Sequence, residues 1–226
     1  MMFKQLFDPT SSTYTYLLAA DTGEAVLIDP VYEQLERDVA LLRQYRLTLA
    51  WVLDTHVHAD HVTSANALKA ATGCQTAVGD GCNATGFDHS LNDGDEIRFG
   101  NELVRVIGTP GHTHGSVTYL WRDRVFTGDA LLIGGCGRTD FQAGDASTLY
   151  SSITGKLFAL ADETLVYPGH DYKGRRVTSI GEEKATNPRL AGKSVDEFKA
   201  IMDGLNLPKP KLIDIAVPAN LVGGTV

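Results

Sequence analysis

Four side chains of the kinds that bind metal ions lie within six residues of this chain, in residues 56–61 (His-Val-His-Ala-Asp-His). The apolar run 49–54 before them predicts a buried strand, and residues 62–68 after them predict the start of a helix. A strand that ends in such a turn presents its imidazoles and carboxylate together at one edge of a sheet. Neutral imidazole and carboxylate are the usual protein ligands of Zn, Fe and Mn. We therefore expect a fold that places a metal site at a sheet edge.

Hydrophobic periodicity predicts two runs of strands. The first run begins with a hairpin, because a turn at 21–23 joins two apolar segments. The second run follows the helix after the histidine turn. In chain order, the predicted strands are 14–19, 25–29, 49–54, 102–107, 116–121, 124–127 and 165–168.

Helical patterns separate and follow these strands. The predicted helices are 33–45, 62–71, 149–160, 178–187 and 194–205. The second of them should end at Gly73, because glycine suits a left-handed C-cap. Beyond Pro208 and Pro210 we expect an irregular tail. The order of strands and helices favours an α/β fold with two sheets, each covered by a helical layer.

Charge and composition exclude several classes of function. The chain has a net charge of −8 and no basic run, which argues against a nucleic-acid partner. No apolar run approaches the roughly 18 residues that span a bilayer, and the N-terminus lacks the features of a signal or transit peptide. We therefore expect a cytoplasmic protein with Cys74, Cys82 and Cys136 as reduced thiols, a Cys74–Cys82 bridge being the less favoured alternative.

Three further clusters of candidate ligands each follow a predicted strand. They are residues 109–115 with His112, residues 127–130 with Asp129, and residues 167–172 with His170. Each sets a candidate ligand beside a glycine, which lets the backbone turn sharply or approach a metal closely. Four such clusters, all at strand ends, indicate one shared site.

Together these clusters resemble the metallo-β-lactamase superfamily, whose pattern is HxHxDH, Gly-His, Asp and a final His. The resemblance implies a four-layer αββα sandwich with its metal site at one edge of the two sheets. It implies one metal position at His56, His58 and His112, a neighbouring one at Asp60, His61 and His170, and Asp129 between them. We expect residues 1–175 to form this domain and residues 176–226 to form a short C-terminal helical extension packed on it.

Longer motifs narrow the resemblance to the persulfide dioxygenases, the sulfur dioxygenases of this superfamily. These motifs are Gly-Cys-Gly-Arg-Thr-Asp-Phe at 135–141, Asn-Pro-Arg-Leu at 187–190, Leu-Asn-Leu-Pro-Lys-Pro at 205–210 and Ala-Val-Pro-Ala-Asn at 216–220. The similarity covers essentially the whole chain. It implies an oxidoreductase of sulfide oxidation, a homodimer that uses O2 and water to convert glutathione persulfide to sulfite and glutathione.

The family resemblance also implies one ferrous iron, Fe(II), per chain, held by His56, His112 and Asp129. A face of two histidines and one carboxylate leaves positions on a non-haem Fe(II) open for dioxygen and a substrate sulfur. The residues alone do not choose iron over zinc, because the same ligand types suit both. The other four residues of the pattern would then orient the ligands and bind water, or form the alternative second metal position.

Candidate substrate-binding residues follow from the chemistry of glutathione, which carries two carboxylates. Arg138 is the best candidate to hold one of them, the alternative being an internal salt bridge to Asp140 or Asp145. Tyr172 either donates a phenolic hydrogen bond to the substrate, as a catalytic or binding group, or fills an apolar space. His114 stands where many relatives have proline, and a surface turn residue is favoured over a third imidazole near the iron.

Two other functions stay open. A glyoxalase II-type thioesterase would use all the ligands for two metals and attack glutathione thioesters with a metal-bound hydroxide. The short tail after His170 and the 135–141 motif argue against it. A metal-binding sensor without turnover is the second alternative, and a ligand set with open positions argues against that.

Overall fold

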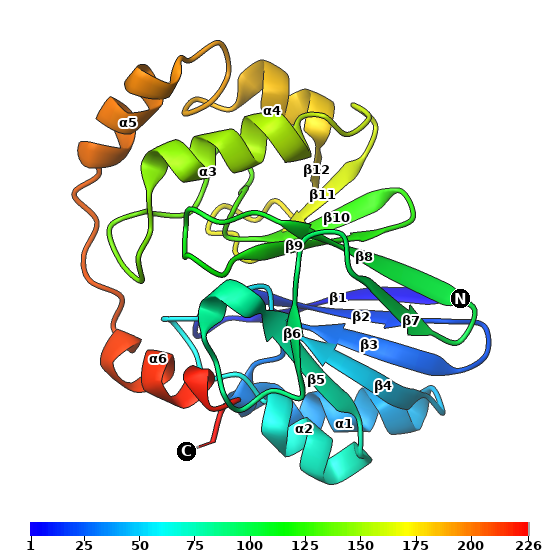
Figure 1. Ribbon diagram of the computed structural model, residues 1–226. Coiled ribbons are helices and arrows are strands. Elements are labelled where there is room, and N and C mark those ends of the chain that lie inside the picture. The colour runs from blue at the N-terminus through cyan, green and yellow to red at the C-terminus, as the bar shows by residue number, and fades with distance from the viewer. Residues whose placement is uncertain (226) are drawn as a thin grey trace.

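The computed structural model describes residues 1–225, which form two six-stranded sheets packed face to face with helices on both outer faces (Figure 1). The first sheet contains, in spatial order, β1 (Met2–Asp8), β2 (Thr13–Ala19), β3 (Glu24–Ile28), β4 (Thr48–Leu53), β5 (Gln75–Gly79) and β6 (His89–Leu91). The second contains β12 (Thr178–Ser179), β11 (Leu165–Pro168), β10 (Arg124–Gly128), β9 (Val117–Trp121), β8 (Glu102–Gly108) and β7 (Glu96–Phe99). The expected αββα sandwich is confirmed.

Each sheet carries its own helical layer (Figure 1). The helices are α1 (Leu35–Gln44) and α2 (Ala65–Thr72) on the first sheet, α3 (Ala146–Ser152), α4 (Ile180–Thr186) and α5 (Val195–Asp203) on the second, and α6 (Ile213–Leu221). Short helical turns, Tyr32–Gln34 and Asp80–Cys82, and a five-residue π-helical extension of α3, Ile153–Leu157, complete the set. None of the helices in residues 1–225 is long and apolar enough to cross a membrane.

Alternation along the strands produces the four layers. In β2, Tyr16 and Leu18 face the core between the sheets, whereas Leu17 and Ala19 face the core beneath α1 and α2. Successive side chains of a strand point to opposite faces, so a strand that is apolar on both faces belongs to a sheet covered on both sides. Strand β2 is buried along its whole length. The interior of the molecule is therefore three stacked apolar layers.

The predicted elements are largely confirmed, including the hairpin of β2 and β3 and the left-handed C-cap at Gly73, whose φ is 76°. Helix α2 begins at Ala65, later than expected, because Val62 and Thr63 pair with the segment after β3. The pattern of Met2–Asp8 mixes polar and apolar residues on both faces and does not predict β1. All three thiols are free, as expected.

The irregular tail expected beyond Pro210 is wrong. Helix α6 forms there despite Pro218 in its interior. Its buried residues Ala216 and Ala219 pack against Val62, beside the histidine turn. Tertiary contacts therefore outweigh the helix-breaking effect of proline, which removes one hydrogen bond of a nine-residue helix.

Candidate metal centre

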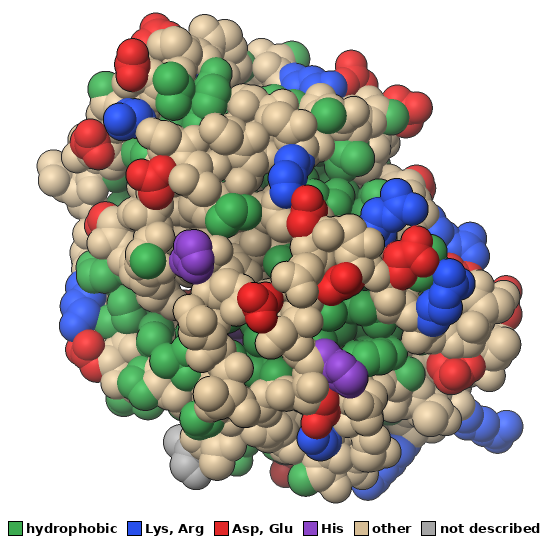
Figure 2. Space-filling view, viewed as in Figure 1, with side chains coloured by type: hydrophobic (Ala, Val, Ile, Leu, Met, Phe, Trp, Pro, Cys, Tyr) green, Lys and Arg blue, Asp and Glu red, His purple; other side chains and the backbone are tan. Residues whose placement is uncertain are grey.

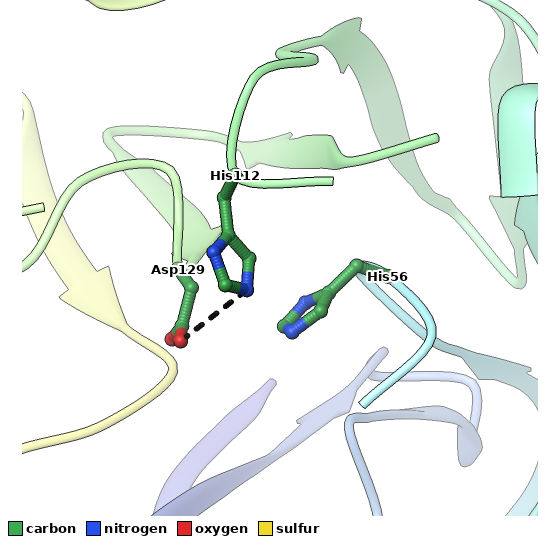
Figure 3. A group of neighbouring side chains, drawn as sticks. All are labelled: His56, His112 and Asp129. Atoms are coloured by element: carbon green, nitrogen blue, oxygen red, sulfur yellow. Dashed lines mark ion pairs between the residues drawn. The ribbon is translucent and has the colours of Figure 1, made fainter. Parts of the chain in front are cut away.

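Three candidate ligands converge from the ends of three strands. His56 follows β4, His112 follows β8 and Asp129 directly follows β10, so the first comes from one sheet and the other two from the second. One nitrogen or carboxylate oxygen of each lies within 4.8 Å of the others. His112 Nε2 is 3.7 Å from Asp129 Oδ2, and the His56 ring points into the same space (Figure 3).

The electrostatics of these groups suit a cation. Burial, together with the neighbouring imidazoles, holds the pKa of His56 well below its usual value, so the ring is neutral. Burial alone would raise the pKa of Asp129, but the surrounding histidines outweigh it and the pKa is lowered. Neutral imidazole and ionised carboxylate are the forms that bind metals.

Hydrogen bonds fix which nitrogen of each imidazole faces the centre. His112 Nδ1 lies 2.6 Å from the carbonyl oxygen of Arg138, and His56 Nδ1 lies 2.9 Å from the hydroxyl of Thr55. A carbonyl only accepts hydrogen bonds, so His112 carries its proton on Nδ1 and leaves the Nε2 lone pair free. Partners of this kind are typical of metal-binding histidines.

Glycines allow the loops to approach the ligands. A Cβ atom on Gly137 would lie 2.7 Å from His112 Nδ1, and one on Gly169 would lie 2.8 Å from Asp129 Oδ1. Gly137 also donates its N–H to the carbonyl of Asp129 at 2.7 Å. The 135–141 motif therefore contacts both ligands that come from the second sheet.

A second group of candidate ligands lies beside the first. His58, Asp60 and His61 form a group of their own within 4.8 Å. His170 Nε2 bridges the two groups, at 3.6 Å from both Asp60 Oδ2 and Asp129 Oδ1. Burial alone would lower the pKa of His170, but these carboxylates outweigh it and raise the pKa to about 9.

Three buried atoms of this region have no hydrogen-bond partner among the described residues. They are His58 Nδ1, His61 Nε2 and Asp129 Oδ1. A buried polar atom without a partner is unfavourable by about 1–3 kcal/mol, and here all three belong to groups that can bind metal. The residues therefore fit a metal centre.

A third group, Asp29, Asp54 and His58, is missing from the sequence prediction. Asp29 accepts hydrogen bonds from Thr55 N at 2.7 Å and from Thr55 Oγ1 at 2.9 Å, and it lies 3.1 Å from His58 Nε2. Burial and the charge of Asp29 raise the pKa of Asp54 well above its usual value, so that carboxyl is neutral. The sequence offered only one signal for this group, a carboxylate at each of two strand ends in the same sheet.

Arg138 is engaged within the protein. Its guanidinium donates to Asp140 at 2.6 and 2.7 Å and to the carbonyl of Pro208 at 2.7 Å, and it stacks on the ring of Phe141. The salt bridge to Asp140 that we named as the alternative is present, and no ion pair joins Arg138 to Asp145 in residues 1–225. A role of Arg138 in binding substrate stays a prediction.

Tyr172 lies beside His170, whereas His114 belongs to no group of candidate ligands in the described residues. The Tyr172 ring is stacked on that of His170, with the ring centres 5.9 Å apart, and the residue is 73% exposed. Desolvation around its hydroxyl and the charges of Asp129 and Asp60 raise its pKa, so the phenol is protonated. His114 is exposed and belongs to none of the three groups of candidate ligands in the described part of the chain.

Comparisons with known proteins agree with this geometry. Residues 8–170 match the family model of the metallo-beta-lactamase superfamily. The chain is 48% identical to the mitochondrial persulfide dioxygenase ETHE1 of Mus musculus and to that of Homo sapiens, each match covering 98% of this chain and 88% of the relative. The crystal structure of ETHE1 from Myxococcus xanthus superposes with a TM-score of 0.97 at 58% identity, over 100% of both chains.

Proposed function

Because the chain belongs to the metallo-beta-lactamase superfamily and, within it, to the persulfide dioxygenases, we propose that it is an iron(II) dioxygenase of glutathione persulfide. The reaction is GSSH + O2 + H2O → GSH + H2SO3. The terminal sulfur of the persulfide loses four electrons and becomes sulfite, the four electrons reduce O2, and the thiol is released.

The observation that carries this proposal is the group of His56, His112 and Asp129. Two neutral imidazoles and one carboxylate on one face would hold a single Fe(II). When bound, Fe(II) supplies an electron donor for dioxygen and open positions for the reactants. Near it, the Tyr172 hydroxyl would donate a hydrogen bond to the substrate, since its raised pKa keeps the proton in place.

We propose that the second group of candidate ligands orients the centre and does not bind the iron. His61 Nδ1 lies 3.0 Å from Asp60 Oδ2, and Thr13 Oγ1 donates to the same oxygen at 3.0 Å. His170 Nδ1 lies 3.1 Å from the carbonyl of Ser12. These bonds support our proposal that the group orients the centre, while a thioesterase would use it for a second metal.

Metal analysis combined with oxygen uptake tests the proposal. Protein reconstituted without oxygen should hold about one iron per chain and consume O2 when glutathione persulfide is added. Two zinc ions per chain, with hydrolysis of glutathione thioesters and no O2 uptake, would establish the thioesterase. Tight metal binding with neither activity would establish the sensor.

The homodimer is also a proposal. Hydrophobic side chains gather over α6 and the segment before it (Figure 2). Leu207, Leu212, Ile215 and Val222 are between 37% and 60% exposed there. An exposed patch of apolar side chains favours burial against a partner, and light scattering on the purified protein measures the mass. The cytoplasmic location stays a prediction.

A further inference from the structure

Asp29 is held rigidly beneath the histidine turn. It follows β3, is 1% exposed, and has a left-handed backbone with φ of 50°. Its N–H donates to the carbonyl of Leu53 at 3.0 Å, and its own carbonyl accepts from the Thr15 hydroxyl at 2.9 Å. Asp is one of the few residues other than glycine that adopt this conformation readily. The backbone therefore fixes where the carboxylate points.

The hydrogen bonds of the Asp29 carboxylate determine which atom is the donor between the Thr55 hydroxyl and His56 Nδ1. Oδ1 accepts from the backbone N–H of Thr55, and Oδ2 accepts from the Thr55 hydroxyl. Because that hydroxyl has only one proton and gives it to Asp29, its oxygen must accept at the remaining contact. That contact is His56 Nδ1, at 2.9 Å. His56 therefore carries its proton on Nδ1, and its Nε2 lone pair is free.

We propose that Asp29 is a positioning residue that acts on the candidate iron ligand His56 through the hydroxyl of Thr55. The chain of two hydrogen bonds fixes the tautomer and the orientation of the imidazole, and the negative end of the chain makes Nε2 a stronger donor. Outer partners of metal-binding histidines typically change metal affinity by about 10- to 100-fold. The inference deepens the proposed function and rests on the metal centre that it assigns.

The same carboxylate also orients a second imidazole. His58 Nε2 lies 3.1 Å from Asp29 Oδ1. Because the carboxylate oxygen only accepts, Nε2 must carry the proton and donate it. The His58 lone pair is then on Nδ1, the buried atom without a partner. Asp29, which belongs to neither of the first two groups of candidate ligands, thus fixes the tautomers of two neighbouring histidines of the turn, whose ring centres lie 4.1 Å apart.

Paired substitutions of threonine test this inference. Thr55→Val keeps the shape and removes the hydroxyl, whereas Thr55→Ser keeps the hydroxyl. The matched control is Thr63→Val: Thr63 is equally buried in the same turn, but its hydroxyl donates to Asp54 at 3.1 Å and contacts no candidate ligand of the first group. Apoprotein of each variant is titrated with Co(II) alone, and affinity and the visible d–d spectrum are recorded.

We expect Thr55→Val to bind Co(II) about 10- to 100-fold more weakly, with a shifted d–d spectrum. Thr55→Ser and Thr63→Val should stay within about threefold of the unmodified protein. Unchanged affinity and spectrum in Thr55→Val would overturn the proposal, as would an equal loss in Thr63→Val, since that loss would be a general effect of destabilising the turn.

Asp29→Asn gives a second test that also applies if Thr55→Val does not fold. The amide nitrogen of Asn cannot accept the Thr55 proton, so this variant should lose a similar factor of affinity, and wild-type affinity would overturn the proposal. Failure of the proposed role of Asp29 can be distinguished from failure of the proposed dioxygenase function. Protein that shows the expected affinity differences but consumes no O2 refutes the dioxygenase and leaves the role of Asp29 intact.

Discussion

Replacing Gly137 by alanine should displace the candidate metal ligand His112 by an amount that the structure defines. The added Cβ would lie 2.7 Å from His112 Nδ1 and 2.5 Å from the carbonyl oxygen of Asp129. Ordinary contacts begin near 3.4 Å, so the imidazole has to move by roughly 0.7 Å and the carbonyl by roughly 0.9 Å. Metal–ligand distances tolerate shifts of only about 0.2 Å. We therefore expect Gly137→Ala to bind Fe(II) about 100-fold more weakly or worse.

The same loop offers a matched control. A Cβ on Gly135 would meet nothing closer than the Arg189 side chain at 3.9 Å. Gly135→Ala should therefore keep normal iron content. Both variants should retain the far-UV circular dichroism of the native fold, because the contacts of Gly137 lie in loops outside the apolar cores.

The assay is competition with an Fe(II) chelator under anaerobic conditions, followed by oxygen uptake with glutathione persulfide. Lower iron affinity and lower O2 uptake in Gly137→Ala, with neither lost in Gly135→Ala, is the expected result. Wild-type iron affinity in Gly137→Ala would refute the reasoning, because it would show that iron binding does not depend on the positions of His112 and Asp129.

Three further predictions concern stability. Burial raises the pKa of Asp38 from 3.8 to about 6, so ionised Asp38 opposes folding by about 3 kcal/mol above pH 6. Asp38→Asn should therefore have a higher Tm than the unmodified protein at pH 7.5 but not below pH 4. A variant whose Tm equals that of the unmodified protein at both pH values would contradict this. In apoprotein, the pKa of His170 is about 9, above its unfolded value of 6.5, so its stabilisation is complete below pH 6.5 and lost as the pH rises through 9. Differential scanning fluorimetry should show Tm falling over this interval, and a fall of equal size in His170→Gln would assign it to other groups. Asn220→Ala removes three hydrogen bonds to buried backbone groups and should lower the free energy of unfolding in urea by about 2–4 kcal/mol; a loss under 1 kcal/mol would show that the turn does not depend on them.

The positions of the ligands could be predicted because each depends on local signals. A strand pattern ends, a glycine follows, and an imidazole or carboxylate stands at the end. Where strands end at one edge of two packed sheets, such residues meet, as His56, His112 and Asp129 do. Periodicity and spacing therefore predicted that these residues share one site without knowledge of any contact, whereas the choice of these three as iron ligands came from the family resemblance and stays a prediction.

The roles of Asp29 and Arg138 depend on contacts that no local pattern encodes. Asp29 reads as the end of a strand before Pro30, and only the packing of β3 beside β4 brings it under Thr55. From the sequence, Arg138 is either a cation that binds substrate or the partner of a nearby carboxylate such as Asp140, and only this local partner could be named in advance. Its partner Pro208 is 70 residues away in the chain. Helix α6 was missed for the same reason, since its stability comes from residues it packs on.

The 187–190 motif holds the loop that carries Arg138. Asn187 Nδ2 donates to the carbonyl of Gly135 at 3.1 Å, and Arg189 Nη1 donates to the carbonyl of Cys136 at 2.6 Å. Two residues after Cys136, the carbonyl of Arg138 accepts the hydrogen bond of His112 Nδ1. A shift of this loop therefore moves the candidate ligand His112 directly. The 187–190 motif therefore acts on the second-sheet side of the centre.

The 216–220 motif acts on the other side. Asn220 Nδ2 donates to the carbonyls of His58 and His61 at 2.9 and 2.8 Å, and its oxygen accepts from Thr63 N at 2.8 Å. No strand of one sheet pairs with a strand of the other in the described residues. Two main-chain hydrogen bonds nevertheless cross between the sheets: Val117 N donates to the carbonyl of Thr55 at 2.8 Å, and Tyr14 N donates to that of Gly169 at 2.8 Å. The spacing between His56 on the first sheet and the candidate ligands on the second depends on these bonds, on side-chain packing and on segments that contact both. The tail is such a segment, because Asn187 and Arg189 hold one half of the candidate centre and Asn220 holds the other. This explains why motifs typical of the family lie so far along the chain from the candidate metal ligands.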